Sequence, residues 1–258
     1  MKRKFKLNVS LAVIFFFSSE ISILSQNTFT DKLIKQVTSA VKNSNQIVLV
    51  TSPDWNSTEA KLQYFEKNTN KWNSVSNSFA VNLGRKGLGW GRGLVNFNTA
   101  TGPIKHEGDG KSPAGIFKLS YAFGFASNDS SKWIKLPYLQ LTNSIECIDD
   151  TISSCYNTVV DSKNKISDWA SSEKMRKIPE YKYGVFVEHN TNPNISAKGS
   201  CIFLHVWKGP GKPTSGCTSM SEENMVKLLS WLNAKKKPIL IQLTNSEFEN
   251  VKMFLKLN

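Results

Sequence analysis

Short apolar runs separated by turn residues dominate the chain from residue 46 to residue 243. Runs of this kind, bounded by Gly, Pro, Asn and Ser, predict β-strands rather than long helices. The predicted strands cover residues 46–50, 61–65, 79–83, 115–119, 158–160, 184–187, 201–205 and 238–243. Many short strands with frequent turns favour a sandwich or a barrel. The pattern therefore predicts a mainly β fold with a few helices.

Two stretches depart from this pattern and show the spacing of amphipathic helices. The first precedes the first strand and has apolar residues at Phe29, Leu33, Ile34, Val37 and Val41. The second comes directly after Cys217, where Ser219-Met220-Ser221-Glu222 has the form of a capping box. Its apolar positions are Met225, Leu228, Leu229 and Leu232. We expect this second helix to pack on the sheet.

The N-terminus has the pattern of a secretory signal peptide. A basic stretch, residues 1–6, precedes an apolar stretch, residues 7–17, that is too short to span a bilayer. We predict a signal peptide at 1–25, a helical segment at 26–44, one folded domain at 45–246 and a C-terminal tail at 247–258. An uncleaved N-terminal anchor is the alternative. The prediction is an exported protein of the periplasm or cell envelope, without stable membrane insertion after cleavage.

The charge of the chain points to anionic partners. The net charge is +13, and removal of residues 1–25 takes away a net +3 and leaves +10. A basic surface attracts anionic lipid, cell-wall polymer or nucleic acid. Export and the absence of a recognition motif exclude nucleic acid as a favoured partner. The alternative is a charge that serves solubility alone.

Four cysteines are present, and an exported chain is expected to form disulfides. A bridged thiol cannot act as a nucleophile. If Cys217 is catalytic, at most one bridge forms among the other three. The plausible pairs join Cys147 to Cys155 or to Cys201, and the sequence does not choose between them.

The stretch from His205 to Cys217 carries the candidate chemistry. His205 ends an apolar strand, a Gly/Pro-rich loop follows, and Cys217 comes directly after Ser215-Gly216. An imidazole beside a thiol is the minimum for cysteine nucleophilic catalysis. We expect the N-terminus of the following helix to lower the pKa of Cys217, and its N–H groups to bind an oxyanion. Gly216 would allow close approach of backbone and substrate.

These residues resemble a known family. His205 with Thr214-Ser215-Gly216-Cys217 is similar to the signature of the YkuD-type L,D-transpeptidases, which cross-link bacterial cell walls. A second segment, residues 107–117, resembles the "GDGxTPxGxF" motif of the same family. Residues 87–93 and 201–207 resemble the branch without appended wall-binding modules. The resemblance extends from about residue 46 to residue 243, and two motifs in the right order make it fairly specific.

The resemblance implies a β-sandwich-like catalytic domain with a helix after the catalytic cysteine. It also implies a two-step reaction on peptidoglycan stem peptides, which serve as donor and acceptor. Cys217 would form a thioester acyl-enzyme, and His205 would accept and return protons. A backbone carbonyl commonly orients this histidine. The resemblance implies no cofactor. No spacing of His, Cys, Asp and Glu residues in the sequence predicts a metal site. We predict that the protein is a monomer.

Several positions depart from the family pattern. Ser215 stands where many members have His, and Thr218 and Ser219 stand where many have an apolar residue and then Asn or Arg. The candidate oxyanion and substrate-binding residues are Ser215, Gly216, Thr218, Ser219 and the strand-end His189. For His189 the alternative is an ordinary strand-end histidine. Cations that could replace the missing carboxylate-binding residue are Lys208, Lys212 and Arg92.

Two alternatives to the transpeptidase remain open. Transfer to water instead of an amine would make the protein an L,D-carboxypeptidase that trims tetrapeptide stems. A non-catalytic wall-binding domain with every cysteine bridged belongs to a different class. A free Cys217 distinguishes both enzymes from the binding domain.

Overall fold

The computed structural model describes residues 33–69, 71–97 and 101–255. The predicted signal peptide and Phe29 lie outside the described residues. A helix covers residues 33–42, and Val37 and Val41 on its apolar face are buried, as the spacing predicts. Within these three ranges, no helix combines the length and apolar character needed to cross a membrane.

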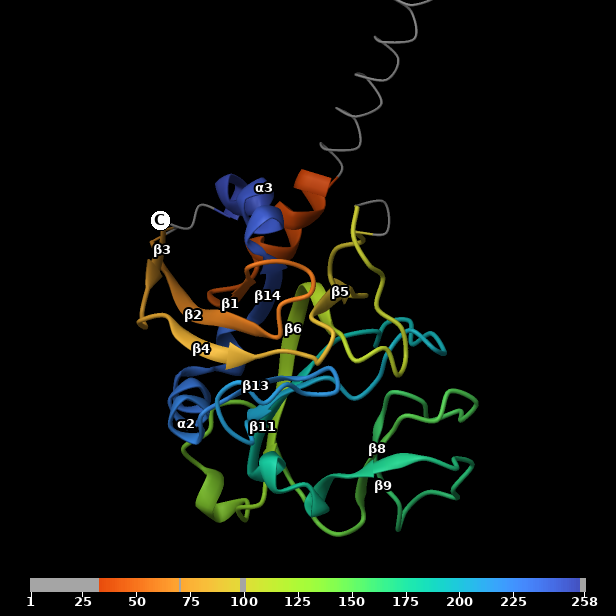
Figure 1. Ribbon diagram of the computed structural model, residues 1–258. Coiled ribbons are helices and arrows are strands. Elements are labelled where there is room, and N and C mark those ends of the chain that lie inside the picture. The colour runs from red at the N-terminus through yellow and green to blue at the C-terminus, as the bar shows by residue number, and fades with distance from the viewer. Residues whose placement is uncertain (1–32, 70, 98–100, 256–258) are drawn as a thin grey trace, which may run out of the picture.

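The domain is built on a sheet that closes on itself (Figure 1). The large sheet contains β1 (Gln46–Ser52), β2 (Glu59–Asn68), β3 (Lys71–Ser74), β4 (Phe79–Asn82), β5 (Leu88–Trp90), β6 (Ser112–Gly124), β7 (Tyr138–Gln140), β11 (Tyr183–Val187), β12 (Phe203–Val206), β13 (Thr218–Met220) and β14 (Ile239–Thr244). Its strands follow the order β1-β14-β6-β11-β12-β13-β4-β2, and β2 then pairs with β1. This closure makes a barrel in which each strand from β1 round to β2 has a neighbour on both sides.

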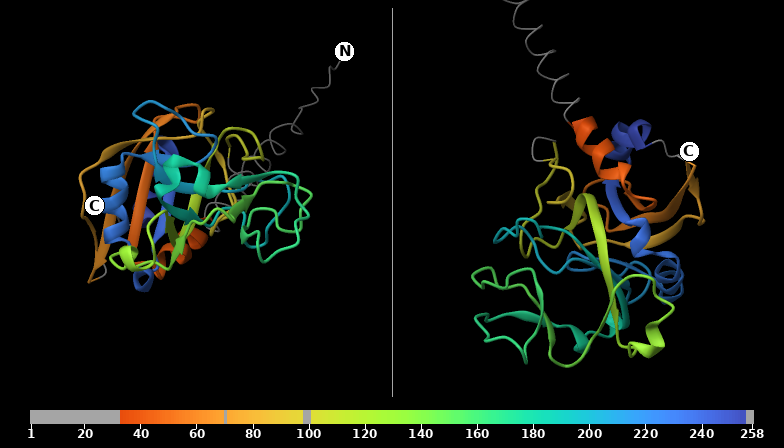
Figure 2. Two further views of the ribbon diagram at one scale, coloured as in Figure 1. Left: turned by 90° about the horizontal axis from the view of Figure 1, so that it is seen from below. Right: turned by 180° about the vertical axis from the view of Figure 1, so that it is seen from behind.

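A smaller sheet stands beside the barrel. It is formed by β10 (Ser172–Lys174), β8 (Ile145–Ile148) and β9 (Val159–Asp161), with β8 in the middle. Figure 2 shows this part of the chain projecting from one side of the barrel. A disulfide between Cys147 in β8 and Cys201, just before β12, joins the small sheet to the barrel wall. The bridge is one of the two pairings expected from the sequence.

The barrel wall separates two apolar cores, because alternate residues of a strand face opposite sides. In β12, Leu204 and Val206 belong to the main core inside the barrel. Phe203 belongs to a second core outside the wall, together with Cys147, Tyr181, Cys201 and Cys217. The small sheet covers this second core through β8. His205 shares the outer face with Phe203, so the candidate site lies outside the barrel, under the small sheet.

The main helix of the C-terminal half, α2 (Glu222–Trp231), buries Met225, Leu228 and Leu229 in the main core. The final helix, α3 (Asn245–Leu255), follows β14 and buries Val251 and Leu255. The predicted C-terminal tail is therefore helical as far as Leu255.

Candidate active site

Cys217 lies at the end of the loop after β12, directly before β13. Its Sγ accepts a hydrogen bond from the Phe203 N–H at 3.3 Å and donates to the Cys201 carbonyl at 3.5 Å. The thiol is free, as is that of Cys155, and the Cys217 side chain is only 7% exposed. A free Cys217 removes the basis for the binding domain with every cysteine bridged.

The expected position of Cys217 at a helix N-terminus is wrong. Thr218, Ser219 and Met220 form β13, and α2 begins only at Glu222. The cap is Ser221, whose hydroxyl accepts from the Asn224 N–H, rather than Ser219. The capping box predicted from the sequence begins at Ser219, but pairing of β13 with β12 and β4 keeps this residue extended.

The electrostatic environment also differs from the expectation. Burial raises the pKa of the Cys217 thiol to about 12, and the negative charge of Glu173 adds to this rise. The Phe203 N–H, the Tyr181 hydroxyl and the Lys105 ammonium act in the opposite direction and lower the pKa. In the resting site the cysteine is therefore a thiol, and a nearby base would have to remove its proton before the sulfur could act as a nucleophile.

His205 has the properties of that base. Its Nδ1 donates to the Val206 carbonyl at 2.7 Å, because a carbonyl oxygen only accepts. The other ring nitrogen, Nε2, is then the unprotonated one. Burial lowers the pKa of His205 to about 4, so the ring is neutral at neutral pH. A backbone carbonyl thus orients the imidazole.

The register of the strands places the pair on one face. β12 and β13 run parallel, with His205 beside Ser219 and Leu204 beside Thr218. Cys217 and Ser219 share a face of the chain because they are two residues apart, and this is the face that carries His205. The imidazole on β12 and the thiol, directly before the neighbouring β13, therefore lie on the same outer surface of the barrel.

The loop before Cys217 is fixed by the second sequence motif. The Thr214 hydroxyl donates to the Cys217 carbonyl at 2.6 Å, and the Ser112 hydroxyl donates to the same oxygen at 3.0 Å. Gly216 lies against Lys111, where an added Cβ would stand 3.2 Å from the Lys111 carbonyl oxygen. Residues 107–117 and the Ser-Gly-Cys loop thus form one packed unit, which explains why the two motifs occur in one chain.

A protein-family model of the L,D-transpeptidase catalytic domain, YkuD, matches residues 55–241, which include every group described above. The chain belongs to the YkuD family. Members act as acyltransferases on peptidoglycan and are typically periplasmic or associated with the cell wall. No curated protein matches the chain in a sequence search.

A solved structure gives a weaker similarity. The helical cell shape determining protein Pgp2 from Campylobacter jejuni aligns with a TM-score of 0.38 and 14% identity. The alignment covers 82% of this chain and 55% of that one, so this chain spans about half of that protein. A similarity of this size carries no argument about activity.

Three other residues predicted to contact the substrate, Ser215, Ser219 and Thr218, lie in environments that differ from one another. Ser215 is exposed and accepts from Arg85 Nη1 at 3.2 Å. Ser219 faces the same side as His205, and its buried hydroxyl has no partner among the described residues. Thr218 points into the barrel, where its hydroxyl donates to Gln242 Oε1 at 2.7 Å.

His189 lies just after β11 and is buried with both ring nitrogens in use. Its Nδ1 accepts from the Arg92 N–H at 3.2 Å, and its Nε2 lies 3.0 Å from the Lys198 carbonyl. Burial, with the positive charge of Lys105, lowers the pKa of His189 to about 3. These bonds connect three segments of backbone and leave neither nitrogen for a substrate.

Two groups beside Cys217 were missed by sequence reasoning. Lys105 is 4% exposed, and its ammonium lies 3.9 Å from the position of a Cβ on Gly216. Tyr181, from the 3₁₀ helix η3 (Pro179–Lys182), packs its ring edge on His205 at 5.2 Å. Both residues lie far from Cys217 in the sequence, and only the folded chain brings them to the site.

The three cations suggested from the sequence are less well placed than Lys105 to bind a substrate carboxylate beside Cys217. Lys208 is exposed and 3.9 Å from Glu180, and Lys212 is exposed. Arg92 donates to Asn190 at 3.1 Å.

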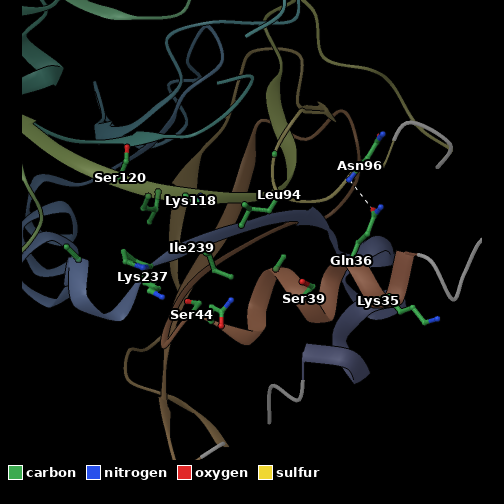
Figure 3. A pocket seen from close by; sticks show the side chains of 16 residues that line it. Lys35, Gln36, Ser39, Ser44, Leu94, Asn96, Lys118, Ser120, Lys237 and Ile239 are labelled. Carbon is green, nitrogen blue, oxygen red and sulfur yellow. Dashed lines mark hydrogen bonds between the residues drawn. The ribbon is translucent and has the colours of Figure 1, made fainter. Parts of the chain in front are cut away.

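A cavity of about 1170 Å³ lies between helix 33–42 and strands β6 and β14 (Figure 3). It is separate from the candidate site, since Cys217 and His205 are not part of its lining.

Proposed function

We propose that this protein is a cysteine-dependent L,D-transpeptidase that cross-links peptidoglycan stem peptides through a thioester on Cys217. The supporting observation is the arrangement of His205 and Cys217. A neutral imidazole with an unprotonated Nε2 on β12 and a free thiol directly before the adjacent β13 share one outer face of the barrel, within a YkuD domain.

The first step is acylation of Cys217. His205 Nε2 takes the thiol proton while Sγ attacks the carbonyl that joins an L-centre to a terminal D-residue of the donor stem. The peptide C–N bond breaks, and His205 returns the proton to the departing amine. The D-residue leaves, and the acyl group remains on sulfur as a thioester.

The second step transfers the acyl group. An amine of an acceptor stem attacks the thioester carbonyl, His205 accepts a proton from this amine, and the C–S bond breaks. The proton then returns to the thiolate of Cys217. Water in place of the amine would give the tripeptide product of an L,D-carboxypeptidase.

Substrate contacts are proposed for the loop and strand next to Cys217. Ser215 and Gly216 line the approach to the sulfur, and the Ser219 hydroxyl, which lacks a protein partner among the described residues, is available to a substrate atom beside His205. The ammonium of Lys105 would bind a carboxylate of the stem peptide, in place of the residue that Ser219 replaces.

The proposal also covers location and assembly. Residues 1–25 would direct export and be removed, and the mature protein would act as a monomer in the periplasm or cell envelope. Its net charge of +10 after cleavage suits an anionic wall.

Product analysis tests the reaction. The full mature chain is incubated with a disaccharide-tetrapeptide, and the products are identified by mass spectrometry. We expect a cross-linked dimer with release of the terminal D-residue. Tripeptide alone would identify the carboxypeptidase instead, and unchanged tetrapeptide would contradict both activities.

A substitution tests the proposed role of Lys105. Lys105→Gln removes the cation but retains an amide that can donate to Asp109, the present ion-pair partner at 2.6 Å. Because a charge-assisted hydrogen bond contributes about 1.5–3 kcal/mol, we expect KM for the donor to rise by roughly 10- to 100-fold. The kcat should change much less. Steady-state kinetics give both constants.

The controls for Lys105 separate binding from folding. Lys105→Arg keeps the positive charge and should recover part of the affinity for the donor. Lys212→Met removes an exposed cation from the loop before Cys217 and should leave KM unchanged. An unchanged KM in Lys105→Gln, with a normal thermal melt, would show that this lysine does not bind the stem peptide.

A further inference from the structure

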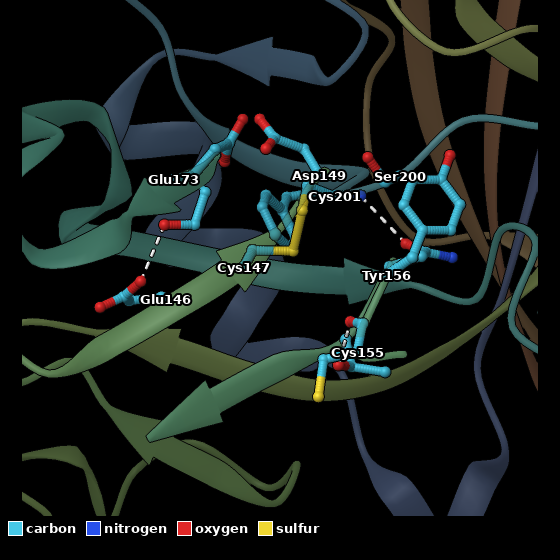
Figure 4. Close-up of a disulfide and its surroundings, with 12 residues drawn as sticks. Glu146, Cys147, Asp149, Cys155, Tyr156, Glu173, Ser200 and Cys201 are labelled. Atoms are coloured by element: carbon cyan, nitrogen blue, oxygen red, sulfur yellow. Dashed lines mark hydrogen bonds between the residues drawn. A yellow bond between two sulfur atoms is a disulfide. The ribbon is translucent and has the colours of Figure 1, made fainter. Parts of the chain in front are cut away.

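A carboxylate that the proposed reaction does not use lies close to Cys217. Glu173 is in β10 and pairs in register with Cys147 of β8. Cys147 is bridged to Cys201, and the Cys201 carbonyl accepts the thiol hydrogen of Cys217. Figure 4 shows Glu173 and Asp149 on the same side of this disulfide. The small sheet thus holds Glu173 in a fixed position relative to the thiol.

Tyr181 connects the carboxylate to the sulfur. Its hydroxyl donates to Glu173 Oε2 at 2.6 Å and also lies within hydrogen-bonding reach of the Cys217 sulfur. The ring is 4% exposed, with edge contacts to Phe203 at 5.3 Å and Phe123 at 5.6 Å. Packing on these two rings and on His205 fixes where the hydroxyl points.

A single proton must serve two acceptors. A tyrosine hydroxyl has one hydrogen to donate, and an ionised carboxylate can only accept. When Glu173 is ionised, the Tyr181 hydrogen points to Glu173, and the hydroxyl offers only lone pairs to Cys217. A protonated Glu173 can instead donate to the Tyr181 oxygen. The Tyr181 hydrogen is then available to a thiolate.

We propose that Glu173 is a positioning residue for Cys217, which directs the Tyr181 hydrogen either to its own carboxylate or to the cysteine sulfur. This inference rests on the proposed role of Cys217 as the nucleophile. An ionised Glu173 keeps the cysteine as a thiol in two ways, through its negative charge and through the direction of the Tyr181 hydroxyl. A protonated Glu173 removes both effects and stabilises the thiolate.

Burial, together with the charged groups around Glu173, places this change near neutral pH. Burial raises the pKa of Glu173 to about 7, the Tyr181 hydrogen bond lowers it, and the negative charges of Asp149 and Glu107 raise it. On the Cys217 side, the Lys105 ammonium is the facing cation. As the pH falls through about 7, Glu173 takes up a proton, and the thiolate becomes easier to form.

The test measures the reactivity of the thiol directly. The rate of alkylation of Cys217 by iodoacetamide is followed against pH in the full mature chain, with Cys155→Ser removing the other free thiol. In Glu173→Gln the amide can donate to Tyr181, and no charge remains. We expect the pH midpoint of alkylation to fall by about one unit, as is typical for loss of a neighbouring like charge and gain of a hydrogen bond.

A double-mutant cycle distinguishes the hydrogen bond from simple charge repulsion. In a Tyr181→Phe background, Glu173→Gln should shift the midpoint by less than half as much. Asp149→Asn is the matched control, because it removes a charge beside Glu173 from a carboxylate that accepts from Ser171, whereas the Tyr181 hydroxyl donates to Glu173, and it should shift the midpoint less than Glu173→Gln. Thermal melts confirm that each variant is folded.

Two results would overturn the inference. An equal shift in the Tyr181 and Tyr181→Phe backgrounds would show that Glu173 acts by charge alone. The absence of a shift in Glu173→Gln would show that the residue does not influence the thiol. Alkylation needs no stem peptide, so either result can be read independently of whether the protein proves to be a transpeptidase.

Discussion

Replacing Cys217 with alanine is expected to reduce transpeptidase turnover by at least roughly 10⁴-fold, as loss of a covalent nucleophile does in other acyl-transfer enzymes. Cys155, the other free thiol, cannot take over this role, because it belongs to a separate buried cluster with Ile148 and Val160. Mass spectrometry of products from the disaccharide-tetrapeptide, over a time course, measures the loss.

The fold should tolerate this change. The two backbone hydrogen bonds of Cys217 Sγ are long, at 3.3 and 3.5 Å, and alanine keeps the Cβ. The melting temperature should therefore stay close to that of the wild type. Cys155→Ala is the matched control and should retain full turnover. Substantial activity in Cys217→Ala would refute the assignment of the nucleophile.

Replacing His205 with alanine should lower kcat by roughly 10²- to 10⁴-fold, the usual contribution of a general base. The effect should be large because the Cys217 thiol has a raised pKa and does not ionise by itself at neutral pH. His106→Ala makes the same substitution at an exposed histidine and should leave kcat unchanged. Steady-state kinetics of the three proteins give the comparison.

The pH dependence provides a second measure of His205. Its pKa of about 4 lies below the ordinary value for histidine, so the neutral, basic form persists at any pH above about 4. The acid limb of kcat/KM should therefore fall as the pH drops through about 4. An acid limb near pH 6.5, the ordinary value, would contradict the buried and neutral His205 described here.

The strands of the barrel were predictable where apolar runs are long. Residues 46–50 lie within β1 and residues 115–119 within β6, as predicted, and the predicted strand at 238–243 lies within β14 except for its first residue. The short strands β3, β5, β7, β8, β10 and β13 were missed. Each has only three or four residues, and its conformation depends on a partner that is distant in the sequence. Thr218-Ser219-Met220, for example, is extended because it pairs with β12.

The candidate site, like the barrel, could be predicted from the sequence only in part. His205 and Cys217 could be identified because a short loop joins them and because both motifs resemble one family. The pKa of Cys217 could not be predicted, since it depends on burial under the small sheet and on Glu173. The predicted capping box at Ser219 is not used, because strand pairing keeps that residue extended and Ser221 caps the helix instead. Lys105 and Tyr181 reach the site only through the fold.

The most direct test of the central claim is the mass of the acyl-enzyme. The full mature chain is mixed with the disaccharide-tetrapeptide without an acceptor, quenched in acid and analysed by intact-protein and peptide mass spectrometry. We predict an adduct of the donor minus its terminal D-residue, carried by the peptide that contains Cys217, removed by hydroxylamine and absent in Cys217→Ala. Turnover without such an adduct, or an adduct on another residue, would contradict the account.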